Sequence, residues 1–214
     1  MPINVMASTA GPVASKLLEI GAIKLSTDKP FTWSSGWKSP IYCDNRLSLS
    51  FPLIRSYIKR CLAEAIREHF PQAGAIAGVA TAGIPQGALV ADELGLPFLY
   101  VRPKPKDHGL ENLIEGRLET GQRVVLVEDL ISTGGSSLKA AAALQDAGAI
   151  VNGMVAIFTY GFQAAATKFE KEGIKLVCLS DFPHVLEIAK QNNFINSDQL
   201  THIKAWRLDP ANWK

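Results

Sequence analysis

The chain has 214 residues, of which 47% are hydrophobic and 20% are charged, which is enough apolar material for a substantial core in one domain. Its formal net charge of +2 is too small to indicate a nucleic-acid or membrane-surface partner, so we expect no nucleic acid and no membrane among its partners. Three widely spaced cysteines, with no leader pattern and no run of about 18 apolar residues, favour a reducing compartment and predict a cytoplasmic protein.

An irregular segment, FTWSSGWKSPIYCDNR, occupies residues 31–46. Its content of Ser, Gly and Pro is too high for a regular helix or strand, and by itself it is also compatible with an ordinary turn region. We expect a single domain over residues 1–214, with a small hood over the site that is built mainly from residues 1–50 and the C-terminal segment.

One helix and several short strands are predicted after this segment. Apolar residues recur at helical spacing over 52–70 and define one helical face. Apolar runs, each separated from the next by a helical or glycine-rich segment, follow at 75–79, 97–101, 124–127, 154–158 and 175–179. Such runs are typical of buried parallel strands joined by crossovers, which predicts an α/β fold. Because ligands bind at the carboxyl ends of such strands, the loops after the first three runs are the candidate site.

The loop after the first run, GVATAGIPQG at 78–87, has small residues between a strand and a helix. Small side chains let the backbone approach a ligand closely. The loop after the second run, 101–121, carries a group of cations: Arg102, Lys104, Lys106 and His108. It is either a solvated hairpin or a lid with hinges at Gly109 and Gly116 that closes over a diphosphate and excludes water.

The stretch 124–137, VVLVEDLISTGGSS, is the most informative part of the chain. Gly134 and Gly135 allow a tight turn that exposes consecutive N–H groups, and the Ala/Leu-rich sequence that follows predicts a helix whose N-terminus attracts a phosphate. Glu128 and Asp129 cannot bind that phosphate, so they are expected to face ribose hydroxyls, Mg²⁺ or both. The chain has neither GxxxxGK[ST] nor GxGxxG, which disfavours P-loop NTPases and dinucleotide dehydrogenases.

The order apolar strand, Glu-Asp, then Thr-Gly-Gly in 124–137 resembles the phosphoribosyl-pyrophosphate (PRPP) signature of the type I phosphoribosyltransferases. Segment 31–46 resembles the hood of one branch, the orotate phosphoribosyltransferases. In the same branch, RPKPKDHG at 102–109 resembles the catalytic loop and 78–87 resembles the pyrophosphate loop. The resemblance implies a type I phosphoribosyltransferase fold, with a mainly parallel twisted sheet flanked by helices and a small N-terminal hood.

The resemblance also implies a reaction. PRPP and orotate would give orotidine 5′-monophosphate and pyrophosphate, a step of pyrimidine (UMP) synthesis, with Mg²⁺ as cofactor. The Mg²⁺ ion would be held mainly by PRPP, near Glu128 and Asp129. In this family the catalytic loop reaches into the neighbouring subunit's site, which implies a homodimer with shared active sites.

The site residues implied by the resemblance fall into three groups. The catalytic residues are Lys106, His108 and Asp129. The orotate-binding residues are Lys38, Tyr42 and Ser132. The PRPP-binding residues are Arg102, Lys104, Lys106, His108, Glu128, Asp129, Leu130, Ile131, Ser132, Thr133, Gly134, Gly135 and Ser136.

The chain departs from the family pattern at several positions. Ser34 and Ala82 stand where some members have lysine, and 159–161 is a region where some members have an arginine that meets the orotate carboxylate. Backbone N–H groups or Ser132 are the candidates to replace that arginine. Two alternatives stay open: a phosphoribosyltransferase for another base, such as uracil or a purine, and a regulatory protein that keeps this fold as a ligand sensor and binds nucleic acid. The low net charge and the lack of a spare domain disfavour the second.

Overall fold

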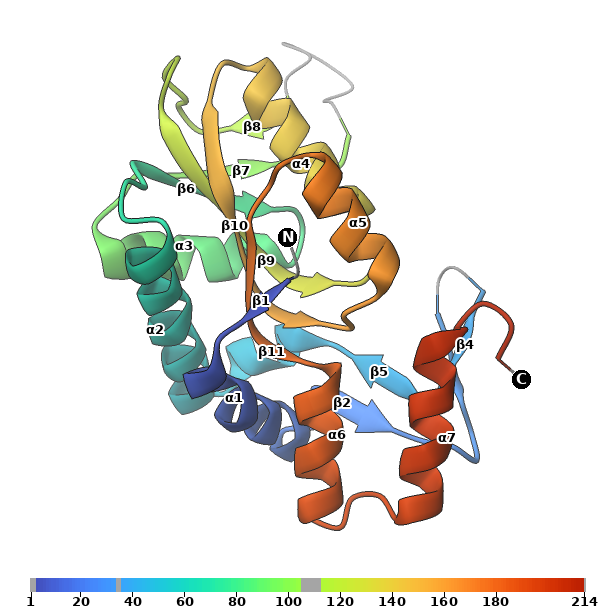
Figure 1. Cartoon of the computed structure of the whole chain (residues 1–214). Coiled ribbons are helices and arrows are strands. Elements are labelled where there is room, and N and C mark those ends of the chain that lie inside the picture. The colour runs from blue at the N-terminus through green and yellow to red at the C-terminus, as the bar shows by residue number, and fades with distance from the viewer. Residues whose placement is uncertain (1–2, 34–35, 105–112, 214) are drawn as a thin grey trace.

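The computed structural model describes residues 3–33, 36–104 and 113–213. Its main feature is a seven-stranded sheet with the order β1-β11-β10-β9-β6-β7-β8 (Figure 1). All neighbouring strands are parallel except β7 and β8, which pair antiparallel, so the predicted mainly parallel sheet is confirmed. The strands are β1 (Asn4–Val5), β6 (Ala75–Val79), β7 (Phe98–Val101), β8 (Ile114–Glu115), β9 (Arg123–Ile131), β10 (Ile150–Thr159) and β11 (Leu176–Asp181).

Both faces of the central strands are buried. Val125 and Val127 belong to one hydrophobic cluster, whereas Val124 and Leu126, which alternate with them in β9, belong to a second cluster. Neighbouring strands β10 and β11 divide their residues between the two clusters in the same way. A strand buried on both faces has no polar alternation, and this is why these strands read as continuous apolar runs in the sequence.

Helices cover the two faces of the sheet (Figure 1). The predicted helix at 52–70 is confirmed as α2, with Pro52 in its first turn, where the missing N–H costs nothing. No helix in the described ranges is both long and apolar enough to cross a membrane. The first cluster is covered by α1 (Ala7–Glu19), α2 (Pro52–His69), α3 (Gly83–Leu94) and α6 (Phe182–Gln191), and the second by α4 (Gly135–Asp146) and α5 (Gln163–Lys171).

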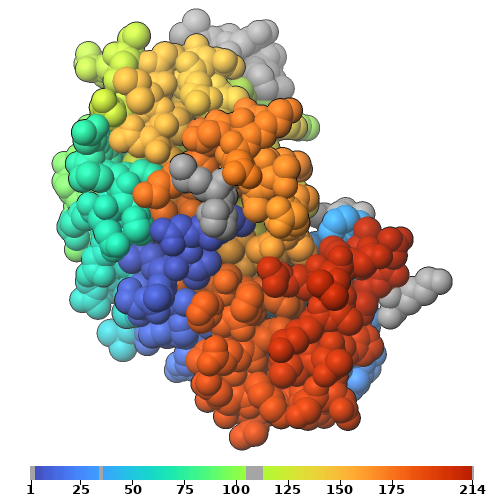
Figure 2. All heavy atoms as spheres, viewed as in Figure 1, coloured from blue at the N-terminus to red at the C-terminus, as the bar shows by residue number. Residues whose placement is uncertain are grey.

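Two small antiparallel pairs and the C-terminal helix lie beside the sheet, and we call them the hood. The hood consists of β2 (Ile23–Leu25) with β5 (Ile41–Cys43), β3 (Phe31–Thr32) with β4 (Lys38–Ser39), and α7 (Ser197–Leu208). Figure 2 shows α7, in red, as part of a lobe set apart from the yellow and orange helices α4 and α5. A 3-10 helix, η1 (Asn45–Ser50), joins β5 to α2.

The N-terminal residues differ from the sequence expectation. Asn4 and Val5 pair with β11 as an edge strand of the main sheet, and α1 packs against β11 and α6. The first 20 residues therefore cover a face of the sheet and part of the β11 edge, and they leave a strand of only two residues at that edge.

Strands β9 and β10 are longer than predicted. The apolar run suggested a strand over 124–127, yet β9 continues through both acids to Ile131 and stays paired with β10 as far as Thr159. The sequence did not indicate this extension, because an apolar run marks only the part of a strand that is buried on both faces, and the additional residues include polar ones. As a consequence, Glu128 and Asp129 lie in a strand and not in a loop.

Candidate active site

The carboxyl end of β9 leads through residues 132–134 into the N-terminus of α4, as predicted. Gly134 precedes the helix with a φ of +74°, in the left-handed region that favours glycine. A Cβ at this position would also lie 2.8 Å from Phe169 Cε2. The turn therefore requires glycine, and the helix that starts at Gly135 has free N–H groups that favour an anion. We call residues 132–136 the phosphate turn, after the ligand that the sequence predicts for it.

The two neighbouring acids of β9 have different surroundings, because alternate residues of a strand point to opposite faces. Glu128 is buried, with Oε1 accepting from the Asp129 N–H and Oε2 accepting from the Ser137 hydroxyl of α4, both at 3.0 Å. Burial, and then the charge of Asp129, raises the pKa of Glu128 well above its ordinary value. The sequence predicted two presented carboxylates, whereas in this structure Glu128 ties β9 to α4. Its contact with PRPP stays a prediction.

Asp129 is the partly exposed acid of the pair. Burial raises its pKa, while the hydrogen bond with Glu128 and the charge of Arg46 lower it. Arg46 follows β5 and donates to the Asp44 carboxylate at 2.6 and 2.9 Å, which lowers the pKa of Asp44. The main-chain carbonyl of Asp129 accepts a 2.6 Å hydrogen bond from Asn45 Nδ2. Asp129 is thus the carboxylate available to a ligand, and Asp44, Asn45 and Arg46 of the segment after β5 lie close to it.

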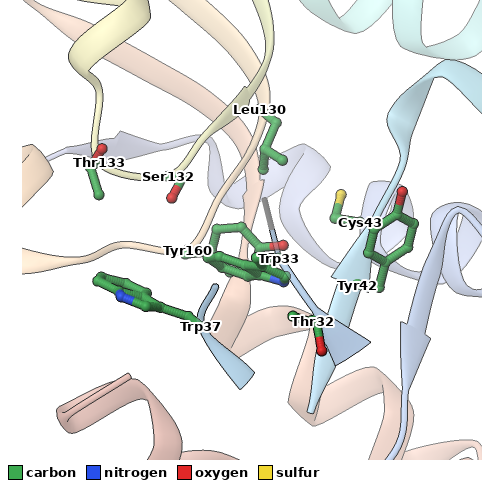
Figure 3. A pocket seen from close by; sticks show the side chains of 9 residues that line it. All are labelled: Thr32, Trp33, Trp37, Tyr42, Cys43, Leu130, Ser132, Thr133 and Tyr160. Atoms are coloured by element: carbon green, nitrogen blue, oxygen red, sulfur yellow. The ribbon is translucent and has the colours of Figure 1, made fainter. Parts of the chain in front are cut away.

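A pocket of about 510 Å³ lies between the end of β9 and the hood (Figure 3). We call it the base pocket, after the base that the resemblance predicts for Tyr42 and Ser132, and its size suits a small planar ring. One side comes from the sheet and the other from the hood, as the labelled side chains of Figure 3 show. The lining residues are Leu130, Ser132, Thr133 and Tyr160 from the sheet side, and Thr32, Trp33, Trp37, Tyr42 and Cys43 from the hood.

Aromatic side chains form one wall of the base pocket. The Trp33 and Tyr160 rings have centroids 4.9 Å apart and lie side by side in Figure 3. Trp206 of α7 is fully buried behind them, with its ring 5.5 Å from that of Trp33, and its Nε1 donates to the Lys38 carbonyl at 3.0 Å. The wall is therefore fixed by packing as well as by hydrogen bonds.

The next residue of α7, Arg207, holds the chain where β10 ends. Its Nε donates to the Tyr160 carbonyl at 3.1 Å and its Nη2 donates to the Gly161 carbonyl at 2.9 Å. Since Trp206 binds the hood and Arg207 binds the end of β10, one turn of α7 joins the two sides of the base pocket.

The loop after β6 reaches the same end of the sheet. The peptide between Ala80 and Thr81 is cis, and α3 starts directly afterwards at Gly83. A Cβ on Gly83 would overlap the carbonyl oxygen of Val127 in β9. Glycine at this position therefore lets α3 begin in close contact with the central strand, so the loop lies beside the acids.

Comparisons with known proteins identify the family. The family model described as phosphoribosyl transferase domain matches residues 49–187. The orotate phosphoribosyltransferase of Cytophaga hutchinsonii is 56% identical over 202 residues, which cover 94% of this chain and 97% of that relative. The chain belongs to the orotate phosphoribosyltransferase family.

Solved structures agree with this assignment and confirm the predicted α/β fold of type I phosphoribosyltransferases. Leishmania donovani UMP synthase matches with a TM-score of 0.78 and 27% identity, over 94% of this chain and 42% of that longer chain. The orotate phosphoribosyltransferase from Aeropyrum pernix matches with a TM-score of 0.70 and 30% identity, over 82% and 97%. The Mycobacterium tuberculosis enzyme in complex with PRPP matches with a TM-score of 0.63 and 26% identity, over 81% and 99%.

The structure brings together several of the residues that the orotate phosphoribosyltransferase motifs predicted. Leu130, Ser132, Thr133 and Tyr42 line the base pocket. Gly134, Gly135 and Ser136 form the turn and the first residues of α4. The side chain of Ile131 is different, because it is fully buried in the core and its carbonyl accepts the Tyr160 N–H at 3.1 Å. The side chain of Ile131 is therefore not available to PRPP, and a contact through its main chain stays a prediction.

Lys38 does not line the base pocket itself. It is exposed, and its Nζ donates to the Thr32 hydroxyl at 2.7 Å. Because Thr32 lines the pocket, Lys38 lies at the rim. Its predicted contact with orotate would need either a short movement of its side chain or Thr32 as an intermediary.

The predicted catalytic loop of the orotate phosphoribosyltransferases is described only at its base. Lys106, His108 and Gly109 lie outside the described residues. Strands β7 and β8 pair antiparallel, so the base of the segment is a hairpin at the sheet edge. Arg102 Nη1 lies 3.5 Å from Glu115 Oε1 across this hairpin, and Lys104 is exposed. A lid function for the tip stays a prediction.

Sequence reasoning missed the aromatic wall and the buried amide of Asn45. Trp33, Trp37, Tyr160 and Trp206 come from three separate segments, and no spacing rule connects them. A usable signal did exist, since two of the four tryptophans of the chain lie within the segment that resembles the family's hood.

Proposed function

We propose that this protein transfers the 5-phosphoribosyl group of PRPP to orotate, giving orotidine 5′-monophosphate and pyrophosphate in de novo UMP synthesis. The observation that carries the proposal is the position of the base pocket beside Asp129 and the phosphate turn, at one end of one strand. A base, a ribose and a 5′-phosphate need three neighbouring subsites in this order. Membership of the orotate phosphoribosyltransferase family supports the same reaction.

The phosphate turn is suited to the 5′-phosphate of PRPP. Gly134 lets the chain pass close to the ligand, and the first N–H groups of α4 and the hydroxyls of Thr133 and Ser136 donate hydrogen bonds. These donors carry no specificity for the base. Their role is to fix the ribose so that its C1′ atom faces the base pocket, which converts binding energy into correct orientation.

Asp129 acts on the ribose. As the bond between C1′ and the diphosphate breaks, positive charge develops on the ribose ring, and a nearby carboxylate stabilises this charge more strongly than it stabilises the ground state. Asp129 is the partly exposed acid next to both the base pocket and the phosphate turn. No covalent nucleophile is required.

The departing diphosphate needs cations. Arg102 and Lys104 begin the segment that connects β7 to β8, and the family motif adds Lys106 and His108 farther along it. We assign these residues to the diphosphate, where their charges neutralise the leaving group once the segment closes over the site. In the described structure Glu115 holds Arg102, so Arg102 must exchange this partner for the diphosphate.

The base pocket accepts orotate between aromatic side chains. Trp33 and Tyr160 give a fixed apolar wall, and Tyr42, whose side chain is partly exposed, lies on the hood side. The hydroxyls of Ser132 and Thr32 line the same pocket and are available to the polar edge of the base. Lys38, bonded to Thr32, supplies positive charge at the rim for the carboxylate.

Mg²⁺ fits this site as a substrate-bound ion. Among the described residues no group of three or more His, Cys, Asp or Glu side chains could hold a metal. Mg²⁺ typically keeps several waters and binds through one or two carboxylates plus substrate phosphates, so Asp129 with PRPP is a sufficient donor set. When bound, the ion would reduce the charge of the diphosphate and make it a better leaving group.

We also infer that the protein is a cytoplasmic homodimer with shared sites, and that the hood and the sheet of each subunit form a single domain. The three cysteines are all unpaired, which suits a reducing compartment. The family motif in the segment after β7 supports exchange of the catalytic loop between subunits.

Mixing inactive Lys106→Ala with inactive Asp129→Asn protein tests this exchange. If the loop serves the neighbouring subunit, each heterodimer has one intact site, and activity returns toward about half. If each loop serves its own subunit, mixing restores nothing although subunits exchange.

The substrate assignment is tested by measuring pyrophosphate release from PRPP and Mg²⁺ with orotate, uracil or hypoxanthine. We expect release with orotate only, together with formation of orotidine 5′-monophosphate. Faster release with uracil or hypoxanthine would assign the protein to another base. A protein that binds PRPP but releases no pyrophosphate with any base would favour the ligand-sensor alternative.

A further inference from the structure

We propose that Asn45 is a positioning residue that couples the base pocket to the catalytic carboxylate of Asp129. This inference rests on the proposed function, because it takes Asp129 as the group that acts on the ribose. It adds a residue that does not bind substrate and that is not among the site residues implied by the resemblance, although it lies within segment 31–46.

The side chain of Asn45 makes one hydrogen bond to β9 and one to a residue of the base pocket. Its Nδ2 donates to the main-chain carbonyl of Asp129 at 2.6 Å, although the two residues are 84 positions apart. Its Oδ1 accepts from the Cys43 thiol at 3.3 Å, and Cys43 lines the base pocket. Asn45 itself is 1% exposed, so water cannot replace these partners. One buried amide therefore joins the wall of the pocket to the strand that carries the acid.

The place of this hydrogen bond in the sheet explains its importance. On one side, the pairing of β9 with β6 ends at Gly78 and Val127, two residues before Asp129. Beyond that point, a strand needs another partner for its main-chain groups, because an unpaired buried carbonyl is costly. Asn45 supplies a donor to the carbonyl of Asp129 and so extends the hydrogen-bonded part of β9 on this side as far as the acid.

Asn45 is held in place by its own neighbours. Its carbonyl accepts from the Ser48 hydroxyl at 2.6 Å, and Ser48 Oγ in turn accepts from Gln86 Nε2 of α3 at 3.3 Å. Gln86 Oε1 is the one fully buried side-chain polar atom without a hydrogen-bond partner among the described residues. These hydrogen bonds link β9 through Asn45 and Ser48 of η1 to Gln86 of α3, and they hold Asn45 in place.

The coupling has a consequence for the reaction. Strand β5 carries Tyr42 and Cys43 of the base pocket. A movement of β5 is transmitted through Asn45 to the backbone of Asp129, because Asn45 is hydrogen-bonded to both Cys43 and Asp129. Binding of the base then favours the position of Asp129 that stabilises the ribose cation. A misplacement of about 1 Å at such a group can cost about 100-fold in rate.

Asn45→Ala tests the proposal, with Ser180→Ala as a matched control. Ser180 is also fully buried, and its hydroxyl donates to the carbonyl of Ala10, 170 positions away, so its loss removes a comparable hydrogen bond away from the site. We expect Asn45→Ala to lower kcat by about 10- to 100-fold with little change in the KM for PRPP. Ser180→Ala should keep kcat while losing similar thermal stability. Equal kcat in the two variants would overturn the proposal.

A double-variant comparison separates positioning from general destabilisation. If Asn45 acts through Asp129, Asn45→Ala lowers kcat in the wild-type background but has little further effect in Asp129→Asn protein. Effects that multiply would show that Asn45 acts independently of Asp129, and would overturn the proposal.

A third measurement does not depend on activity. Amide hydrogen exchange over residues 128–131 should become faster in Asn45→Ala but not in Ser180→Ala, because only the first loses the bond at the end of β9. Unchanged exchange would contradict the proposal whatever the protein's substrate. A wild-type protein that makes no orotidine 5′-monophosphate, together with the expected exchange, would instead reject the proposed function and leave the contact in place.

Discussion

The base pocket and the phosphate turn lie at the same end of the sheet, but they are built in different ways. Large side chains form the base pocket, and they come from the hood, the end of β10 and α7 behind it. The phosphate turn is mostly backbone, from one continuous segment in which Gly134 takes a conformation that other residues avoid. A base presents a flat apolar surface, whereas a phosphate needs many N–H donors close together.

This difference predicts how the two regions respond to change. Substitutions of the aromatic side chains of the base pocket should alter the affinity for the base and leave the phosphoribosyl group in place. Substitutions in the phosphate turn or at Asp129 should alter PRPP binding or its activation. The predictions below use this division of labour, from the largest expected effect to the smallest.

Asp129→Asn should have the largest effect. Asparagine keeps the shape of the side chain but cannot stabilise the ribose cation, so we expect kcat to fall by about 10²–10³-fold with an intact fold. Steady-state kinetics with orotate and PRPP, with thermal unfolding as the fold control, measure this. Near-normal turnover in a folded variant would remove Asp129 from the catalytic site.

Lys106→Ala should lower kcat by about 10²-fold and raise the KM for PRPP much less. The reason is that a residue of a closing loop acts chiefly in the closed state, where the diphosphate departs. The same assay gives both constants. An unchanged kcat with a raised KM would make Lys106 a simple binding group.

Glu128→Gln should have a smaller effect, seen in stability as a function of pH. Burial raises the pKa of Glu128 above its unfolded value, so the wild-type protein loses stability as the pH rises through the folded pKa. Glutamine never ionises. The Tm of Glu128→Gln minus that of wild type should therefore increase as the pH rises above about 4.3, the ordinary pKa of a glutamate.

The control for this measurement is Glu172→Gln, because Glu172 is exposed after α5. Its Tm difference from wild type should not change with pH. A difference that shrinks with pH for Glu128→Gln would mean that the buried carboxylate is stabilised as an anion, in conflict with the direction of its pKa shift.

The main sheet could be predicted from the sequence because each of its central strands has a signal within its own residues. Runs such as 124–127 are buried on both faces, so each strand is visible without knowledge of its neighbours. The Gly-rich turn before α4 could be predicted for the same reason, since the conformation of Gly134 and the helix that follows are set within one segment. The family motifs added the loops at the carboxyl ends of the strands.

The rest could not be predicted because it depends on contacts between distant segments. The different roles of Glu128 and Asp129 follow from Ser137 and Asn45, and only the fold places these two side chains beside β9. Likewise the C-terminal segment was expected to contribute to the hood, but no spacing rule indicates that its Trp206 and Arg207 contact Trp33 and the end of β10.

The most direct test of the division of labour compares Trp37→Ala with Gly134→Ala in one set of kinetic measurements. Loss of one aromatic contact, equivalent to about 0.5–1.5 kcal/mol, should raise the KM for orotate about two- to tenfold in Trp37→Ala and leave the KM for PRPP unchanged. Strain of about 1–2 kcal/mol at a left-handed position, with a clash against Phe169, should raise the KM for PRPP about tenfold in Gly134→Ala and leave that for orotate unchanged. If both variants raise both constants equally, the base pocket and the phosphate turn do not divide the substrates between them.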